Sequence, residues 1–117
     1  MTPYELARLG AELALSKKAH DITILDLREI SDMADYFVIC SGDSDTQVKA
    51  ISDAITEGIK AEGQKVSRTE GYNNLQWVLV DLFDVVIHVF QQRIREYYNL
   101  ERLWGDAPME SVEDTAA

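Results

Sequence analysis

The sequence contains one cysteine, two prolines and six glycines in 117 residues. A lone Cys40 cannot form an intramolecular disulfide, which is typical of proteins from a reducing compartment. Its place in the apolar run 36–40 predicts a buried structural thiol rather than a nucleophile. No apolar run approaches the roughly 18 residues of a membrane span, and no basic and apolar targeting pattern opens the chain. We therefore expect a cytosolic protein that does not bind a membrane.

Basic residues are also few, because 11 lysines and arginines face 21 aspartates and glutamates, giving a formal net charge of −10. Phosphate backbones repel such a chain, so direct nucleic-acid binding is not expected as its main activity. The same field favours a basic protein partner and accelerates their encounter. Many acidic proteins have no basic partner, so the charge is only a modest indication.

Two helix starts and five strand-like runs define the predicted fold. Thr2-Pro3-Tyr4-Glu5 has the residues of an N-cap, a first-turn proline and a capping box. Ser44-Asp45-Thr46-Gln47 repeats the pattern, and an apolar helical stripe follows it up to Gly63. Strands are predicted at 22–27, 36–40, 64–69, 77–82 and 84–90, and a last helix at 91–98 with an apolar turn at 100–104. This order predicts an α/β single domain with a mixed five-stranded β-sheet and packed helices.

The length supports one hydrophobic core and not two, so we place the single domain at residues 1–104. Residues 105–117 contain four acids, no base and Pro108. That composition predicts a disordered acidic tail.

The runs 77–82 and 84–90 predict an antiparallel hairpin. With residues 82–83 as a two-residue loop, Trp77 lies opposite His88 and Asp81 opposite Asp84. Aromatic rings, His88 and the aspartates share one face, which is typical of a recognition surface. The other face is aliphatic and suited to packing under a helix, with Val78, Val80, Val85, Ile87 and Val89.

This hairpin lies inside the longer pattern EGYNNLQWVLVDLFDVVIHVFQQRIREYYNLERLW, which follows DITILDLREISDMADYFVICSGDSDTQVKAISD. Over about residues 21–104 the sequence resembles the ribosomal silencing factor (RsfS) family, also called the iojap family. One departure is Phe83, because the family usually has glycine there, the residue best able to take a positive φ in a tight turn. The resemblance implies the same layout of elements, which is similar to a reduced nucleotidyltransferase core.

The resemblance also implies a function. The implied function is repression of translation, without catalytic activity, cofactor or metal. Members of the family bind large-subunit ribosomal protein fourteen, a small basic protein on the face where the small subunit docks. A protein bound there blocks subunit association sterically.

The candidate partner-binding residues match the family motif and lie on the hairpin or in the segment after it. Tryptophan, tyrosine and arginine are the side chains most often found as interface anchors. The candidates are Glu70, Trp77, Asp81, His88, Arg95, Tyr98, Leu100, Glu101 and Trp104. Helical spacing requires part of the last segment to pack on the sheet, namely Ile94, Leu103 and one of the adjacent tyrosines. Trp104 is expected to be exposed or to form a dimer contact.

Two of these candidates have alternative interpretations. His88 either stacks on Trp77 and presents an edge to a partner, or is a satisfied core histidine. Asp81 opposite Asp84 is unfavourable. A bulge, a basic partner or solvation of both acids would relieve it, as would a cation such as Arg93 or Arg95.

Two other functions are compatible with the sequence. The turn at Gly42 with Asp43 and Asp45, together with Asp81, is similar to the glycine turn and acidic metal ligands of nucleotidyltransferases. However, residues 29–48 contain no lysine or arginine to receive a triphosphate, and helix capping explains the turn more simply. The third possibility is a homodimeric interaction module with a self-complementary aromatic face.

Overall fold

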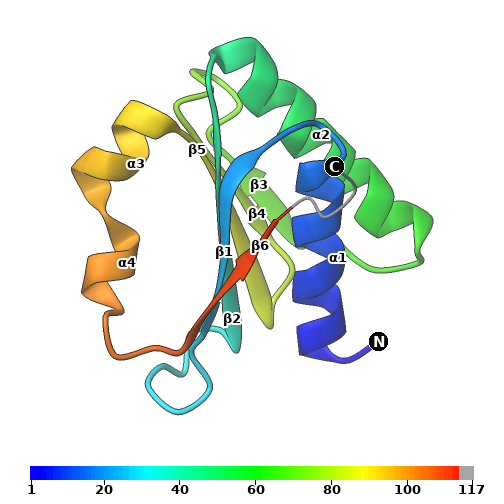
Figure 1. The fold of residues 1–117 in the computed structure, drawn as a ribbon. Helices are drawn as coiled ribbons and strands as arrows, with labels where there is room; N and C mark the ends of the chain where they lie inside the picture. The colour runs from blue at the N-terminus through cyan, green and yellow to red at the C-terminus, as the bar shows by residue number, and fades with distance from the viewer. Residues whose placement is uncertain (114–117) are drawn as a thin grey trace.

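A mixed six-stranded sheet organises the computed structural model, which describes residues 1–113 (Figure 1). The strand order is β3-β4-β5-β2-β1-β6. β2 and β5 are parallel, and the other neighbours are antiparallel. The strands are β1 His20–Asp26, β2 Tyr36–Gly42, β3 Arg68–Glu70, β4 Trp77–Asp81, β5 Val85–Gln91 and β6 Met109–Val112. The α/β class is confirmed, but the predicted count of five strands is wrong.

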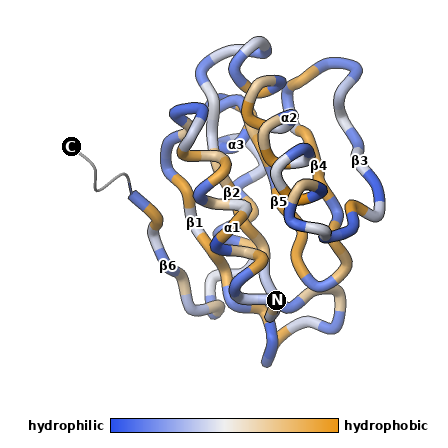
Figure 2. Tube along the Cα trace, turned by 90° about the vertical axis from the view of Figure 1, so that its right-hand side faces the viewer, coloured by the Kyte–Doolittle hydropathy of each residue, from blue (hydrophilic) through white to orange (hydrophobic). Residues whose placement is uncertain are grey.

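The sixth strand lies in the segment for which the sequence predicted a disordered tail. β6 pairs with β1, with Val112 opposite Ile22, and Figure 2 shows β6 and β3 at opposite edges of the sheet. Val112 is buried, and Glu110 accepts hydrogen bonds from the Tyr4 hydroxyl at 2.7 Å and from Arg8 at 2.9 Å. The acidic composition suggested disorder, but an edge strand and a nearby arginine supply partners for the backbone and for the acid. Residues 114–117 of the predicted tail lie outside the described residues.

Four helices pack against the two faces of this sheet: α1 Pro3–Leu15, α2 Asp45–Ala61, α3 Gln92–Tyr98 and α4 Leu100–Leu103. α1 and α2 cover one face, and the short helices α3 and α4 lie on the other (Figure 1). Both predicted helix starts are confirmed, since Thr2 and Glu5 form a complete capping box and Ser44 Oγ accepts from the amide of Gln47. None of the helices within residues 1–113 has the length and apolar character needed to cross a bilayer.

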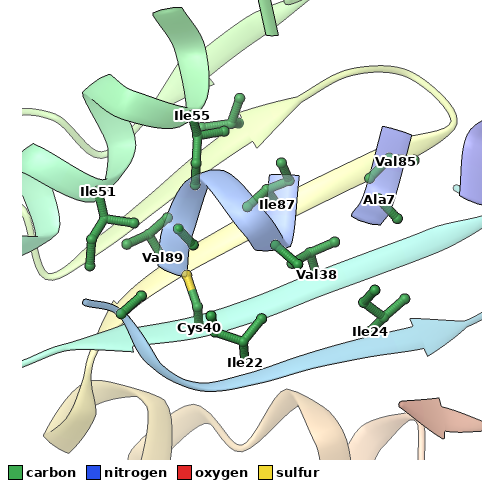
Figure 3. Close-up of a cluster of buried hydrophobic side chains, with 14 of the residues drawn as sticks. Ala7, Ile22, Ile24, Val38, Cys40, Ile51, Ile55, Val85, Ile87 and Val89 are labelled. Carbon is green, nitrogen blue, oxygen red and sulfur yellow. The ribbon is translucent and has the colours of Figure 1, made fainter. Parts of the chain in front are cut away.

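The main core lies between the sheet and the pair α1 and α2 (Figure 3). The aliphatic face predicted for the hairpin is confirmed, because all five of its side chains are buried in this core. α2 contributes the predicted stripe Val48, Ile51, Ile55 and Ile59. Cys40 is a fully buried structural thiol, as predicted, and burial raises the pKa of its thiol to about 12.

The hairpin forms, but its predicted register is wrong. Its turn residues are Phe83 and Asp84, because Leu82 pairs with Val85 through a 2.9 Å backbone hydrogen bond. Trp77 therefore lies opposite Phe90, and Asp81 lies opposite Val86 instead of Asp84. Phe83 has φ +73°, and the amide of Asp84 donates to the carbonyl of Leu82 at 3.1 Å, as in a γ-turn centred on Phe83. A register shift of two residues leaves every side chain on its predicted face, but Asp81 and Asp84 are no longer opposite each other.

Gly71 fixes the loop that leads into β4, and its substitution tests this geometry. Its φ is +93°, and a Cβ there would lie 1.9 Å from the carbonyl oxygen of Trp77. We expect Gly71→Ala to lower the free energy of unfolding by about 3 kcal/mol or more, at the upper end for single substitutions. The matched control is Gly63→Ala, which has φ +75° but no atom within 4 Å of the added Cβ. Gly63→Ala should lower the free energy of unfolding by only about 1–2 kcal/mol, because its alanine must adopt a left-handed backbone conformation. Equal costs in urea titrations would contradict the close approach at Trp77.

Candidate protein-binding face

The second face of the sheet carries the candidate residues of the hairpin. Strand alternation and the observed register place Trp77, Leu79 and Asp81 of β4 beside Val86, His88 and Phe90 of β5. We call this the α3 face. It is only partly covered, because α3 and α4 pack over β5, β2 and β1, whereas β4 and β3 lie farther out, toward one edge of the sheet (Figure 1).

The covered part of the α3 face is a second, smaller core. Its fully or nearly fully buried members are Leu25, Leu27, Ala34, Phe37, Ile39, Phe90 and Ala107. Trp77, Val86, Ile94, Leu100 and Trp104 pack against them. The covered part of the α3 face is therefore core, and the interpretation as a recognition surface stays a prediction for the uncovered part.

The roles predicted for Leu103 and Trp104 are reversed. Trp104 is half-buried and meets Phe37 edge-on with ring centroids 6.0 Å apart, whereas Leu103 is 73% exposed. The cause is Asn99, which takes a left-handed conformation with φ +46° and separates α3 from α4. The helical spacing of α3 therefore does not continue into α4, and a different side of the last turn faces the sheet.

Trp77 and His88 form one polar contact inside this aromatic layer. The indole Nε1–H of Trp77 donates to Nδ1 of His88 at 3.0 Å, so the proton of the neutral imidazole lies on Nε2. Burial lowers the pKa of His88 to about 4. The ring is 4% exposed and Nε2 has no hydrogen-bond partner among the described residues. His88 is thus a core histidine in this structure, and Trp77 shields it while stacking on Phe90 at 4.8 Å and contacting Tyr98 at 5.0 Å.

Arg95 is buried rather than displayed for a partner. Its side chain is 7% exposed and donates to Ser41 Oγ at 2.9 Å, to the carbonyl of Asp21 and to Glu101 at 3.3 Å. Asp21 lies in an irregular part of β1 with φ +51°, between its register positions with β2. Arg95 and Glu101 therefore tie α3 and α4 to the sheet.

The cation that neutralises Asp81 is Arg68, and not Arg93 or Arg95. Arg68 on β3 lies opposite Asp81, with Nε 3.2 Å from its carboxylate, and donates also to Glu70 at 2.8 Å. Asp84 occupies the turn, where its carbonyl accepts from the amides of Asp35 and Tyr36.

One pocket on this face contains residues that the sequence reasoning missed. It has a volume of about 350 Å³ and is lined by Met33, Phe37, Arg68, Leu79, Asp81, Phe83, Val86 and His88. Met33 is 76% exposed and Phe83 is 65% exposed. Met33 lies 50 residues before Phe83, and only the parallel pairing of β2 with β5 brings their loops together. The sequence contained one signal for this pocket, namely the bulky Phe83 at a turn position that favours glycine.

The carboxylates proposed for nucleotide chemistry do not form one site. Asp43 accepts from Nε2 of His20 at 2.8 Å, and Asp45 accepts from the amide of Thr46 at 2.8 Å. Asp81 lies opposite Val86 of β5, which pairs with Phe37 near the start of β2, whereas Asp43 follows the end of β2. Phe37 and Asp43 are six residues apart along an extended strand, or about 20 Å, so Asp81 is too far from Asp43 for a shared metal ion.

Comparison with known proteins identifies relatives over nearly the whole chain. The family model "Ribosomal silencing factor during starvation" matches residues 1–117. The ribosomal silencing factor RsfS of Bacillus subtilis is 46% identical over 97% of this chain and 96% of its own length. That of Halalkalibacterium halodurans is 44% identical over 97% of each chain. A crystal structure of a Chromobacterium violaceum protein superposes with a TM-score of 0.88 at 33% identity, covering 99% of this chain and 97% of that one.

Truncation of Arg95 should test its structural role. We expect Arg95→Ala to lower the free energy of unfolding by about 3–5 kcal/mol, because Glu101 and Ser41 lose their buried partner. Arg93→Ala removes an exposed arginine from the same helix and should change stability by less than about 0.5 kcal/mol. Urea titration of both variants provides the measurement. A near-normal urea midpoint for Arg95→Ala would show that its buried hydrogen bonds do not stabilise the fold.

The buried neutral His88 should make the fold sensitive to mild acid. The unfolded histidine titrates near pH 6.5 and the folded one near 4, so below about pH 6.5 the unfolded chain binds more protons. The contribution of neutral His88 to the free energy of unfolding is therefore fully present above about pH 6.5 and is lost as the pH falls toward 4. We expect His88 to account for a loss of about 2 kcal/mol between pH 7.5 and 5.

The matched variant is His88→Phe, which keeps a ring but cannot titrate. Its unfolding free energy should fall less over the same pH interval than that of the wild type, whatever its absolute stability. Identical slopes would show that His88 is accessible and readily protonated in the fold.

Proposed function

This chain belongs to the family of ribosomal silencing factors, and we propose that it represses translation by binding large-subunit ribosomal protein fourteen. A protein bound at that site covers the face on which the small subunit docks, so the two subunits cannot join. The proposed mechanism is steric and requires no catalytic step, cofactor or metal. It places the protein in the cytoplasm with the ribosomes.

The observation that carries this proposal is a strip of exposed or half-buried aromatic and apolar side chains on the side of the sheet that carries α3 and α4. Its members are Leu103, Tyr98, Trp77, Met33 and Phe83. Tyr98, which is 50% exposed, contacts Trp77, and Trp77 bonds to His88 in the wall of the pocket. Several large aromatic and apolar side chains exposed on one side of a small domain are typical of a protein-binding surface.

The charge of the chain supports a basic partner. The formal net charge is −10, and the exposed acids Asp32, Asp84 and Glu96 border or adjoin the strip. Such a field accelerates the approach of a basic protein and is screened by salt. The association rate should therefore depend more on ionic strength than the dissociation rate does.

The candidate residues divide into two groups under this proposal. Trp77 and Tyr98 contact the partner, and Glu70 and Asp81 lie at the polar edge of the strip beside Arg68. The other candidates, which are half-buried or buried, support the surface from below, namely His88, Arg95, Leu100, Glu101 and Trp104.

Binding energy alone has to maintain silencing. A standard interface buries about 1,600 Å² in total, or about 800 Å² from each partner. That share is about 12% of the 6678 Å² surface of this chain. A standard interface would therefore occupy a modest share of the surface of this chain.

The same strip supports the alternative of a homodimeric interaction module, in which two copies cover each other's aromatic residues. That arrangement and ribosome binding would compete for one surface. If the monomer is the form that binds the ribosome, the strip serves ribosome binding rather than dimerisation.

Co-sedimentation with separated ribosomal subunits tests the proposed function. We expect the protein to sediment with the large subunit and not with the small one. Adding it before the subunits are mixed should lower the yield of joined ribosomes. Equal binding to both subunits, or none to the large one, would falsify the proposal.

Two tyrosine variants provide a matched comparison in that assay. Tyr98→Ala should weaken binding at least about tenfold, or about 1.4 kcal/mol, because Tyr98 lies on the strip. Tyr4→Ala removes a similarly exposed tyrosine from α1, on the opposite side of the sheet, and should leave affinity unchanged.

A further inference from the structure

The pocket beside Phe83 has features that silencing as such does not explain. We call it the Phe83 pocket, with the eight lining residues given above. Its walls come from β2, β3, β4 and β5, and its rim comes from the loops 27–35 and 82–84. The 2.8 Å hydrogen bond from the amide of Asp35 to the carbonyl of Asp84 joins these two loops. The rim side chains Met33 and Phe83 are both largely exposed.

Phe83 occupies a backbone position that disfavours it. Its φ of +73° is in the left-handed region, where a bulky side chain is strained and glycine is not. The fold gains little packing in return, since 65% of the residue is exposed. Strain at an exposed aromatic is typical of a residue retained for binding.

The polar groups around the pocket define what can enter it. His88 in the wall is neutral, and Arg68 is already paired with Asp81 and Glu70. The interior therefore offers no free charge to an ionised group. In the rim loops, Asp32, Asp35 and Asp84 form no ion pair with any basic side chain of residues 1–113. The pocket is thus an apolar site with an acidic rim.

We propose that the Phe83 pocket receives one uncharged, apolar side chain of a protein partner, flanked by lysine or arginine residues that meet the rim carboxylates. Burial of that side chain against Phe83, Met33 and Leu79 supplies binding energy, and the rim selects a basic sequence around it. A negatively charged segment is repelled by the rim, and an inserted cation finds no unpaired acid inside the pocket. The inference deepens the proposed function and rests on it for the identity of the partner as a ribosomal protein.

Substitution of Phe83 separates binding from folding. We expect Phe83→Gly and Phe83→Asn to bind the large subunit at least tenfold more weakly, with a thermal midpoint equal to or above that of the wild type. Both replacements suit a positive φ. Phe83→Tyr should keep wild-type affinity. Met109→Ser, which removes an exposed apolar side chain from β6, is the control for a loss of surface hydrophobicity.

Two results in that series would overturn the inference. One is wild-type affinity for Phe83→Gly and Phe83→Asn, which would leave the proposed function intact but remove the pocket from it. The other is a lowered thermal midpoint for both variants, which would show that Phe83 serves the fold.

A second measurement does not depend on the ribosome. The probe is the peptide acetyl-Lys-Ile-Arg-amide, titrated to millimolar concentration against protein labelled with ¹³C on its methionine methyl groups. We expect it to shift the methyl signal of Met33, whereas acetyl-Glu-Ile-Glu-amide and acetyl-Lys-Ser-Arg-amide do not. Equal shifts with all three peptides, or none, would overturn the inference. If the wild type fails to bind the large subunit, the proposed function fails and this titration still decides the chemistry of the pocket.

Discussion

The parallel pairing of β2 with β5 is the constraint on which the rest of the structure depends. All seven residues of β2 are buried, and each pairs with a residue of β5 from Tyr36 with Val85 to Gly42 with Gln91. Parallel strands cannot be joined by a tight turn, so the chain must cross over between them through α2 and the hairpin partner β4. This crossover places α2 on one face and brings two loops, separated by about 50 residues in the chain, together at the start of both strands.

The two faces of the sheet then differ because of the lengths of the helices that cover them. α1 and α2 have 13 and 17 residues and cover one face, where the buried side chains are almost entirely aliphatic. α3 and α4 have seven and four residues, so they cover only the part of the other face over β5, β2 and β1. Trp77 lies at the boundary, because its ring stacks on Phe90 of the small core and contacts Tyr98 of the strip. The proposed binding surface therefore combines the part of the sheet that the short helices leave uncovered with exposed side chains of those helices and of the adjoining loops.

Buried polar groups hold this second face in place. Arg95 links three segments that are distant in sequence, and Trp77 fixes the tautomer of His88. Such groups are costly to bury unless they are paired, so they specify one arrangement of the short helices more than they add to stability. A rigid support of this kind suits the proposed binding surface, because less conformational freedom is lost on association.

The sequence by itself determined the elements whose signals are local. The capping residues at Thr2 and Ser44, the stripe on α2 and the alternation in the hairpin predicted helices, strands and the main core, and the motif around Trp77 indicated the family. These features depend on residues within a few positions of each other, where backbone geometry leaves few alternatives.

Tertiary structure alone decided the features that need distant partners. β6 is ordered because β1 offers it an edge, Arg95 is buried because Asp21 and Ser41 receive it, and Arg68 rather than a later arginine neutralises Asp81. The hairpin register followed from one positive φ at Phe83, a residue whose own preference opposes it. The pocket between Met33 and Phe83 exists only once β2 and β5 are paired, because no local pattern in either loop encodes the position of the other.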